Sequence, residues 1–183
     1  MNLFSFKKGF LYFCVFIFIN TNLFALDIDK SKSKVAFKAS KLVFVGVDGE
    51  FKDYEGNVSI LNDEIVALNG NVFVNSVESG NKTRDEHIRG EVLFDSKKYP
   101  IISFKMSKYE ALSSANGISK GKIYGLMNAH GVSKDIVFDS TVKKTEEGYI
   151  LTLNSIVDVK KDFNMQSYSI MSNSVDIDVS LCF

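Results

Sequence analysis

The stretch VDIDVSLCF, residues 175–183, alternates strictly between apolar and polar side chains. Successive side chains of a β-strand point to opposite faces of the sheet, so this pattern predicts a strand with one face in a core and the other in water. Helical periodicity is hard to find elsewhere in the chain, whereas this alternation recurs towards the N-terminus. The chain is therefore predicted to be an all-β protein. Further alternating runs begin at Val35, Val43, Val72, Ile102, Ile136 and Leu151.

Turn-forming residues separate the alternating runs and set the expected number of strands. Gly, Asn and Asp favour turns because they tolerate positive φ or hydrogen-bond to their own backbone. Seven to nine strands joined by short turns indicate a sandwich or an up-and-down barrel. The turns are expected at Asp48-Gly49, Glu55-Gly56-Asn57, Leu61-Asn62-Asp63, Asn69-Gly70, Asn116-Gly117 and Glu147-Gly148.

Residues 79–90 lack this alternation and predict a short helix instead. Thr83 and Glu86 have the spacing of a capping box, in which the Thr hydroxyl accepts from the third backbone N–H and the Glu side chain reaches back. Gly90 suits the position that follows the end of a helix. A helix of one to two turns is therefore expected from about Arg84 to Arg89.

The first 25 residues are predicted to be a secretory signal peptide, and residues 26–183 a single domain. Two lysines precede an apolar run from Phe10 to Ile19, and cleavage is expected after Ala25. The run has 10 residues, whereas a helix needs roughly 20 to span a bilayer. The predicted location is the periplasm, with retention of the segment as an N-terminal anchor left open.

Charge and cysteine content exclude several classes of partner. Residues 26–183 carry 20 basic and 22 acidic side chains, a net charge of −2. A near-neutral chain offers no electrostatic case for binding nucleic acid or an anionic membrane surface, and no further membrane-spanning segment is expected. Only Cys182 remains after cleavage, so an intrachain disulfide is excluded and the fold must depend on its core.

Residues that build catalytic and metal sites are sparse. His87 and His130 are 43 positions apart and Cys182 is far from both, so no zinc site is predicted, although calcium held by carboxylates alone stays open. The chain has no G-x-S-x-G elbow, no Gly-rich phosphate loop and no H-E-x-x-H. The protein is predicted to have no cofactor and not to be an enzyme. The alternatives are a lipid-directed enzyme with His87 or His130 as its base, or structural roles in which His130 bonds the backbone at a strand end.

Three segments, taken in order, resemble the YceI-like family: TRDEHIR at 83–89, FDSKKYPIISF at 94–104 and GLMNAHGVSK at 125–134. Members of this family are lipocalin-like, polyisoprenoid-binding proteins of the bacterial periplasm. Supporting matches near both ends extend the resemblance over essentially all of residues 26–183. The sequence departs from the family at Lys41, where His is expected, and at KKDFN, residues 160–164, where Arg-x-Asp-Phe-Gly is usual. These departures concern the head group of the ligand rather than the fold.

The resemblance implies an eight-stranded antiparallel lipocalin-like β-barrel with one short helix and an elongated internal pocket. It also implies a periplasmic binding or carrier protein for a polyisoprenoid, quinone-like or fatty-acyl chain. A barrel of eight strands encloses just enough room for side chains or one small ligand. Burying one methylene contributes about 0.8 kcal/mol, while association costs about 4–15 kcal/mol. Long chains are therefore expected to bind better than short ones.

The phase of the alternation predicts which side chains line this pocket. A polar head group, where the ligand has one, is expected near the mouth, within reach of Arg84, His87 or Lys160. The apolar lining is expected to comprise Phe37, Val45, Phe51, Val72, Val74, Phe104, Met127, Phe138, Leu151, Leu153, Phe163 and Met165.

Other functions stay open on the sequence alone. An outer-membrane barrel is indicated by Phe183, which lies in phase with Val179 and Leu181 at the end of the chain. Such barrels have lipid-facing strands of about 9–11 residues with aromatic girdles, whereas the apolar runs here are shorter and Trp is absent. A periplasmic protein-interaction module, whose outer face matters more than its cavity, and a homodimer are the remaining alternatives.

Overall fold

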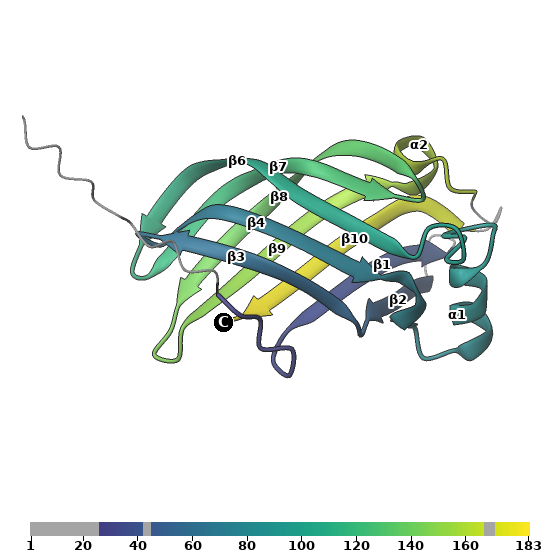
Figure 1. Ribbon diagram of the computed structural model, residues 1–183, viewed down its shortest axis with the longest axis horizontal. Helices are drawn as coiled ribbons and strands as arrows, with labels where there is room; N and C mark the ends of the chain where they lie inside the picture. The colour runs from purple at the N-terminus through teal and green to yellow at the C-terminus, as the bar shows by residue number, and fades with distance from the viewer. Residues whose placement is uncertain (1–25, 42–44, 167–170) are drawn as a thin grey trace, which may run out of the picture.

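The computed structural model describes residues 26–41, 45–166 and 171–183, so the predicted signal peptide and its cleavage point after Ala25 lie outside the described residues. Within these ranges the chain forms one antiparallel sheet that curls around an interior (Figure 1). The predicted antiparallel all-β fold is confirmed. Its strands are β1 (Lys34–Lys41), β2 (Val45–Phe51), β3 (Tyr54–Leu61), β4 (Glu64–Phe73), β5 (Val77–Glu78), β6 (Ile101–Ala115), β7 (Ile118–Ala129), β8 (Val132–Lys144), β9 (Tyr149–Asp158) and β10 (Met171–Cys182).

The sheet has ten strands in the described residues where eight were predicted, and two bends account for the difference. The strand order is β3-β4-β6-β7-β8-β9-β10-β1-β2-β5. Only Lys52 and Asp53 separate β2 from β3, and only the 3-10 helix η1 (Val74–Ser76) separates β4 from β5. Backbone hydrogen bonds from Lys52 N to Ser76 O (3.1 Å) and from Phe73 N to Asp53 O (3.0 Å) carry the pairing across these breaks. The ten strands therefore form eight runs of chain, and the β2–β5 pairing at one end of the strand order continues through the two bends into the β3–β4 pairing at the other end.

Half of the predicted turns are correct. Asn62 and Asp63 join β3 to β4 with φ of 53° and 63°, the left-handed backbone of a tight hairpin turn. The turns at Asn116-Gly117 and Glu147-Gly148 are also present. The other three predictions are wrong, because those glycines lie inside β2, β3 and β4: they are Gly49, Gly56 and Gly70.

These strand glycines allow close approach rather than a reversal of the chain. A Cβ on Gly49 would lie 2.3 Å from the ring of Phe37, its partner on β1. Gly56 pairs with Gly70 across β3 and β4, and a Cβ on Gly56 would lie 2.5 Å from the carbonyl oxygen of Asn69. Glycine inside a strand commonly marks such a contact, and a turn-residue count cannot distinguish the two roles.

Two α-helices lie at the same end of the barrel, opposite the β3–β4 and β6–β7 hairpin turns (Figure 1). The predicted helix is present as α1 (Lys82–Arg89), and Gly90 follows it as expected. Its N-cap is Asn81 rather than the predicted Thr83, and the Asn81 side chain accepts a hydrogen bond from Arg84 N at 3.1 Å. The second helix, α2 (Val159–Phe163), was not predicted because its five residues are too few to show a period.

The end of the barrel that carries the β3–β4 and β6–β7 turns, called the hairpin end below, is filled by packed side chains. Val58, Ile65, Ile123, Val142 and Leu151 are all at most 1% exposed and belong to one cluster. A smaller cluster forms where α1 packs on the barrel, between buried Phe51, Val77 and Ile88. The interior thus divides into a packed hairpin end and a helix end where the cavity lies.

Tyr109, near the hairpin end of β6, has a buried hydroxyl with no hydrogen-bond partner among the described residues. Leaving a polar group unpaired in the interior costs about 1–3 kcal/mol. We therefore expect Tyr109→Phe to raise the free energy of unfolding by about 1 kcal/mol. Tyr149→Phe is the control and should lower it, because the Tyr149 hydroxyl donates to Asp63 at 3.2 Å.

The pH dependence of the free energy of unfolding of the same two variants tests whether the buried Tyr109 hydroxyl is the cause. Desolvation raises the pKa of Tyr109, so the cost of this hydroxyl is constant below about pH 10, and the folded state loses further stability as the pH rises towards and through the raised value, because the unfolded chain gives up the proton more readily. The advantage of Tyr109→Phe in urea unfolding should therefore grow above about pH 10. A Phe variant less stable than the parent at neutral pH contradicts the assignment of an unpaired hydroxyl.

Candidate ligand-binding cavity

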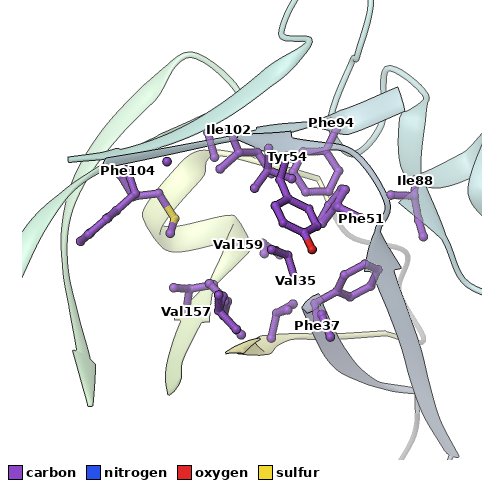
Figure 2. Close-up of a pocket in the computed structure, with 18 of the residues that line it drawn as sticks. Val35, Phe37, Phe51, Tyr54, Ile88, Phe94, Ile102, Phe104, Val157 and Val159 are labelled. Atoms are coloured by element: carbon purple, nitrogen blue, oxygen red, sulfur yellow. The ribbon is translucent and has the colours of Figure 1, made fainter. Parts of the chain in front are cut away.

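A cavity of about 790 Å³ lies mainly at the helix end of the barrel and extends along β10 as far as Leu181. Side chains from every strand except β5, together with residues of α1 and α2, form its wall. Figure 2 shows apolar side chains from opposite sides of the barrel directed towards one shared space, among them Val35, Tyr54, Ile102 and Val157. The volume lies within the roughly 300–1,000 Å³ of typical small-molecule sites, and the predominantly apolar wall suits an apolar ligand.

Most of the predicted lining residues lie on this wall. Alternation along the strands places them correctly, since one face of each strand is turned inward throughout. The side chain of Val45 lies outside the described residues. The nine predicted residues that line the cavity are Phe37, Phe51, Val72, Phe104, Met127, Phe138, Leu153, Phe163 and Met165.

Two predicted lining residues need correction, because Val74 and Leu151 are fully buried in packed regions and are not part of the wall. Val74 lies in η1, where the strand alternation of β4 ends. Leu151 has the same phase as Leu153 on β9 but lies two residues closer to the packed hairpin end. Alternation gives the face on which a side chain lies, and it does not give the depth at which the cavity stops.

Of the three residues predicted to lie near the head group, two line the cavity and one does not. Arg84 and His87 of α1 line the cavity, next to Asn81 and Thr83. Lys160 does not, because α2 turns Phe163 inward and leaves Lys160 exposed. α1 therefore supplies one group of polar wall residues, and a second group comes from β3, β4 and β6: Glu55, Asn69, Asn71 and Ser103.

Several wall residues were missed by the sequence reasoning. Ile88, Leu93 and Phe94 come from α1 and the segment after it, where no strand period marks the inward face. The C-terminal strand β10 contributes a further set whose alternation was recognised but not assigned to a cavity: Val175, Ile177, Val179 and Leu181. That alternation was the available signal for these four residues.

Hydrogen bonds between Ser79, which follows β5, and two residues of α1 hold the start of this helix against the barrel. Asp85, which is 7% exposed, accepts hydrogen bonds from Ser79 N at 2.8 Å and from Ser79 Oγ at 2.5 Å. Arg84 Nε donates to Ser79 Oγ at 2.8 Å, and the same guanidinium donates to the Ser79 carbonyl. These bonds hold the Arg84 side chain at the edge of the cavity and fix where α1 lies.

Removing this carboxylate is expected to loosen α1. Asp85→Ala deletes two hydrogen bonds to a charged acceptor and leaves Ser79 N–H without its partner, so we expect a loss of about 2–3 kcal/mol in the free energy of unfolding. Glu86→Ala, at the neighbouring exposed position, should change it by less than about 0.5 kcal/mol. Urea unfolding measures both, and equal losses contradict the anchoring role of Asp85.

His130 has a structural position beside α2. It follows β7 with φ of 52°, and its Nδ1 lies 3.3 Å from the carbonyl oxygen of Phe163. The ring of Tyr99 packs edge-on against it, with 4.7 Å between centroids. The interpretation of His130 as a strand-end residue bonded to the backbone is confirmed. Asn164, which ends α2 with φ of 53°, fills the left-handed position that the family pattern assigns to glycine.

Neither a metal centre nor a helical membrane span is present in the described part of the chain. No group of three or more His, Cys, Asp or Glu side chains there could hold a metal ion. Among those same residues, no helix combines the length and the apolar character needed to cross a bilayer. The apolar cavity is therefore the feature on which a function can be argued.

Comparison with known proteins agrees with this geometry. The model of the YceI-like domain matches residues 26–183. The chain belongs to the YceI-like family. A UPF0312 protein of Pseudomonas putida is 26% identical over 165 residues, which cover 86% of this chain and 84% of that protein.

Two solved structures of YceI-like and related proteins share the fold. The YCEI protein of Campylobacter jejuni is 32% identical, with a TM-score of 0.62 over 77% of this chain and 87% of that chain. A polyisoprenoid-binding domain from Saccharophagus degradans has a TM-score of 0.66 over 85% of this chain and 95% of that chain. Its sequence is 18% identical, so this second likeness concerns the fold alone.

Proposed function

We propose that this YceI-like protein binds one long apolar chain in its cavity, as a periplasmic binding or carrier protein. The observation that carries the proposal is the cavity of about 790 Å³, because protein interiors are normally packed with few voids and its predominantly apolar wall suits an apolar ligand. The ligand class is a polyisoprenoid, a quinone-like compound or a fatty-acyl chain. The name of the Saccharophagus degradans domain supports the first of these.

The volume of the cavity sets the size of the ligand. A methylene group takes up about as much room as a liquid water molecule, roughly 30 Å³. A cavity of about 790 Å³ therefore holds roughly 26 carbon atoms. At about 0.8 kcal/mol per methylene, twenty of them contribute roughly 16 kcal/mol, which exceeds most estimates of the association cost. Eight methylenes contribute roughly 6 kcal/mol, which only reaches the lower part of that cost, so a preference for long chains follows.

The charge that α1 brings to the cavity wall indicates the orientation of the ligand. Asn81, Thr83, Arg84 and His87 lie on this helix or its cap, whereas the polar wall residues of β3, β4 and β6 carry no positive charge: Glu55, Asn69, Asn71 and Ser103. Arg84 carries a permanent positive charge close to an apolar space, where it attracts a carbonyl, phenol or acidic head group. We therefore place the polar end of the ligand at α1 and the tail towards the packed end of the barrel.

Native mass spectrometry tests the proposal directly. The protein is expressed from its full-length sequence, purified without detergent, and any bound molecule is extracted and identified. A long-chain isoprenoid or acyl compound bound at one per protein supports the proposed function and names the ligand class. A folded protein that carries nothing and takes up no added long-chain lipid contradicts it.

A second candidate function is a protein-interaction module, and one observation favours it. Ile156 on the outer face of β9 is 71% exposed. Leu126 on β7 and Val137 on β8 are 48% and 40% exposed on the neighbouring strands. Exposed apolar groups on one face often mark a site for a partner or a second copy. Light scattering on the purified protein, with Ile156→Lys as the comparison, shows whether this face supports self-association.

A further inference from the structure

On the β6–β9 side of the barrel the cavity wall ends at a definite layer of side chains, whereas on β4 and β10 it continues to Leu68 and Leu181. Phe104 on β6, Phe138 on β8 and Leu153 on β9 belong to its wall. The next inward residues towards the hairpin turns on these strands, Met106 on β6 and Leu151 on β9, are not among the described wall residues. The boundary therefore passes between residues only two positions apart on the same strands.

Two aromatic rings form this boundary. The rings of Phe104 and Phe138 meet edge to face, with centroids 5.1 Å apart and an angle of 88° between their planes. They come from β6 and β8, which are neighbours of β7 on opposite sides. The two rings therefore meet across the inner face of β7 and close the cavity on that side of the barrel.

Glycines on β7 make the room for this arrangement. A Cβ on Gly125 would lie 2.4 Å from Cζ of Phe104, so the ring occupies the space that a side chain would take. Behind it, the ring of Tyr109 lies over Gly121 in the same way, with 2.5 Å to the position of a Cβ. This boundary, called the floor of the cavity below, thus has two aromatic layers. Phe104 lies over Gly125 and Tyr109 lies over Gly121, and both glycines belong to β7.

We infer that the Phe104–Phe138 pair, packed against Gly125, limits the length of apolar chain that this protein holds. The inference rests on the proposed function and adds the residues that decide chain length. A tail that enters past α1 makes new contacts with each isoprene unit until it reaches the two rings. Units beyond that point stay outside the wall and contribute little affinity. Given the cavity volume, about five isoprene units fit.

The test compares prenols of increasing length: geraniol, farnesol, geranylgeraniol, geranylfarnesol and the longer solanesol. Each prenol displaces a fluorescent apolar dye from the purified protein, and the dissociation constant is plotted against the number of isoprene units. For the parent protein, affinity should rise at least tenfold per unit and level off at about five units. Solanesol should bind no more tightly than geranylfarnesol.

Phe104→Ala should move the position at which affinity levels off. Engineered core cavities of this kind measure roughly 150 Å³, room for about one more isoprene unit before the ring of Tyr109 is reached. The control is Phe51→Ala, on the wall near α1, which should weaken binding of every prenol without moving that position. Phe104→Leu and Phe138→Leu test the same point with smaller losses of packing, and circular dichroism and thermal unfolding verify the fold of each variant.

The possible results separate the two proposals. If no prenol displaces the dye from the folded parent protein, the proposed function and the chain-length inference both fail. If prenols bind but affinity keeps rising up to solanesol, or if Phe104→Ala and Phe51→Ala have the same effect at every length, the floor is not the limit and the inference is overturned while binding stands. A shift of one isoprene unit in the Phe104 variants alone supports it.

Discussion

Replacing Ile102 by Glu is expected to lower the affinity for a long apolar chain by at least ~100-fold, while Ile101→Glu leaves it unchanged. The two residues are neighbours on β6 and point to opposite faces: Ile102 lines the cavity and Ile101 is 39% exposed. In an unoccupied cavity a carboxylate at position 102 can keep water around it. An apolar ligand removes that water, and leaving a charge without water or a partner costs several kcal/mol.

The pair is a matched test because both variants add the same charge to the same strand. Affinity is measured by displacement of a fluorescent apolar dye, and thermal unfolding verifies that both variants fold. If Ile102→Glu unfolds the protein, Ile102→Thr gives the milder version, with an expected loss of roughly tenfold. Equal affinities for the two Glu variants indicate that the ligand binds elsewhere, for example on the exposed apolar face around Ile156.

The fold could be predicted because alternation is a local property of each strand. The residues from Val175 to Phe183 show their inward and outward faces without any knowledge of their neighbours. The bends at Lys52 and Asp53 and in η1 have no such signal, so eight runs of chain were predicted without the breaks that divide them into ten strands. Gly56 and Gly70 were misread as turns because glycine serves both close approach and chain reversal.

The candidate site was predicted less completely, for a physical reason. Inward-facing positions were identified correctly, but whether Leu151 or Leu153 faces empty space depends on how far the rings of Phe104 and Phe138 extend across the barrel. That distance depends on how side chains pack across β6, β7 and β8, which the alternation within any one strand does not give. The contributions of Ile88 and Phe94 depend on how α1 packs, and a single short helix gives no period from which its inward face can be read.

Leu151→Ala is expected to be among the most destabilising single changes in the described residues, with a loss of about 3–5 kcal/mol in the free energy of unfolding. Leu151 is 0% exposed and belongs to the main packed cluster, so its removal leaves a void that rigid neighbours on β8 and β10 cannot fill. Urea unfolding measures the loss as a lower midpoint at unchanged slope.

Leu153→Ala is the matched comparison for Leu151→Ala. Leu153 is 4% exposed and lies on the same face of β9, yet one side of it borders the cavity. A side chain beside an empty space has fewer packing contacts to lose, so its loss should be less than about half that of Leu151→Ala. Ligand binding should respond in the opposite order, weakened by Leu153→Ala and left intact by Leu151→Ala in the protein that remains folded. Equal losses of stability would mean that the interior is packed on both sides of Leu153, and the volume required by the proposed function would then be absent.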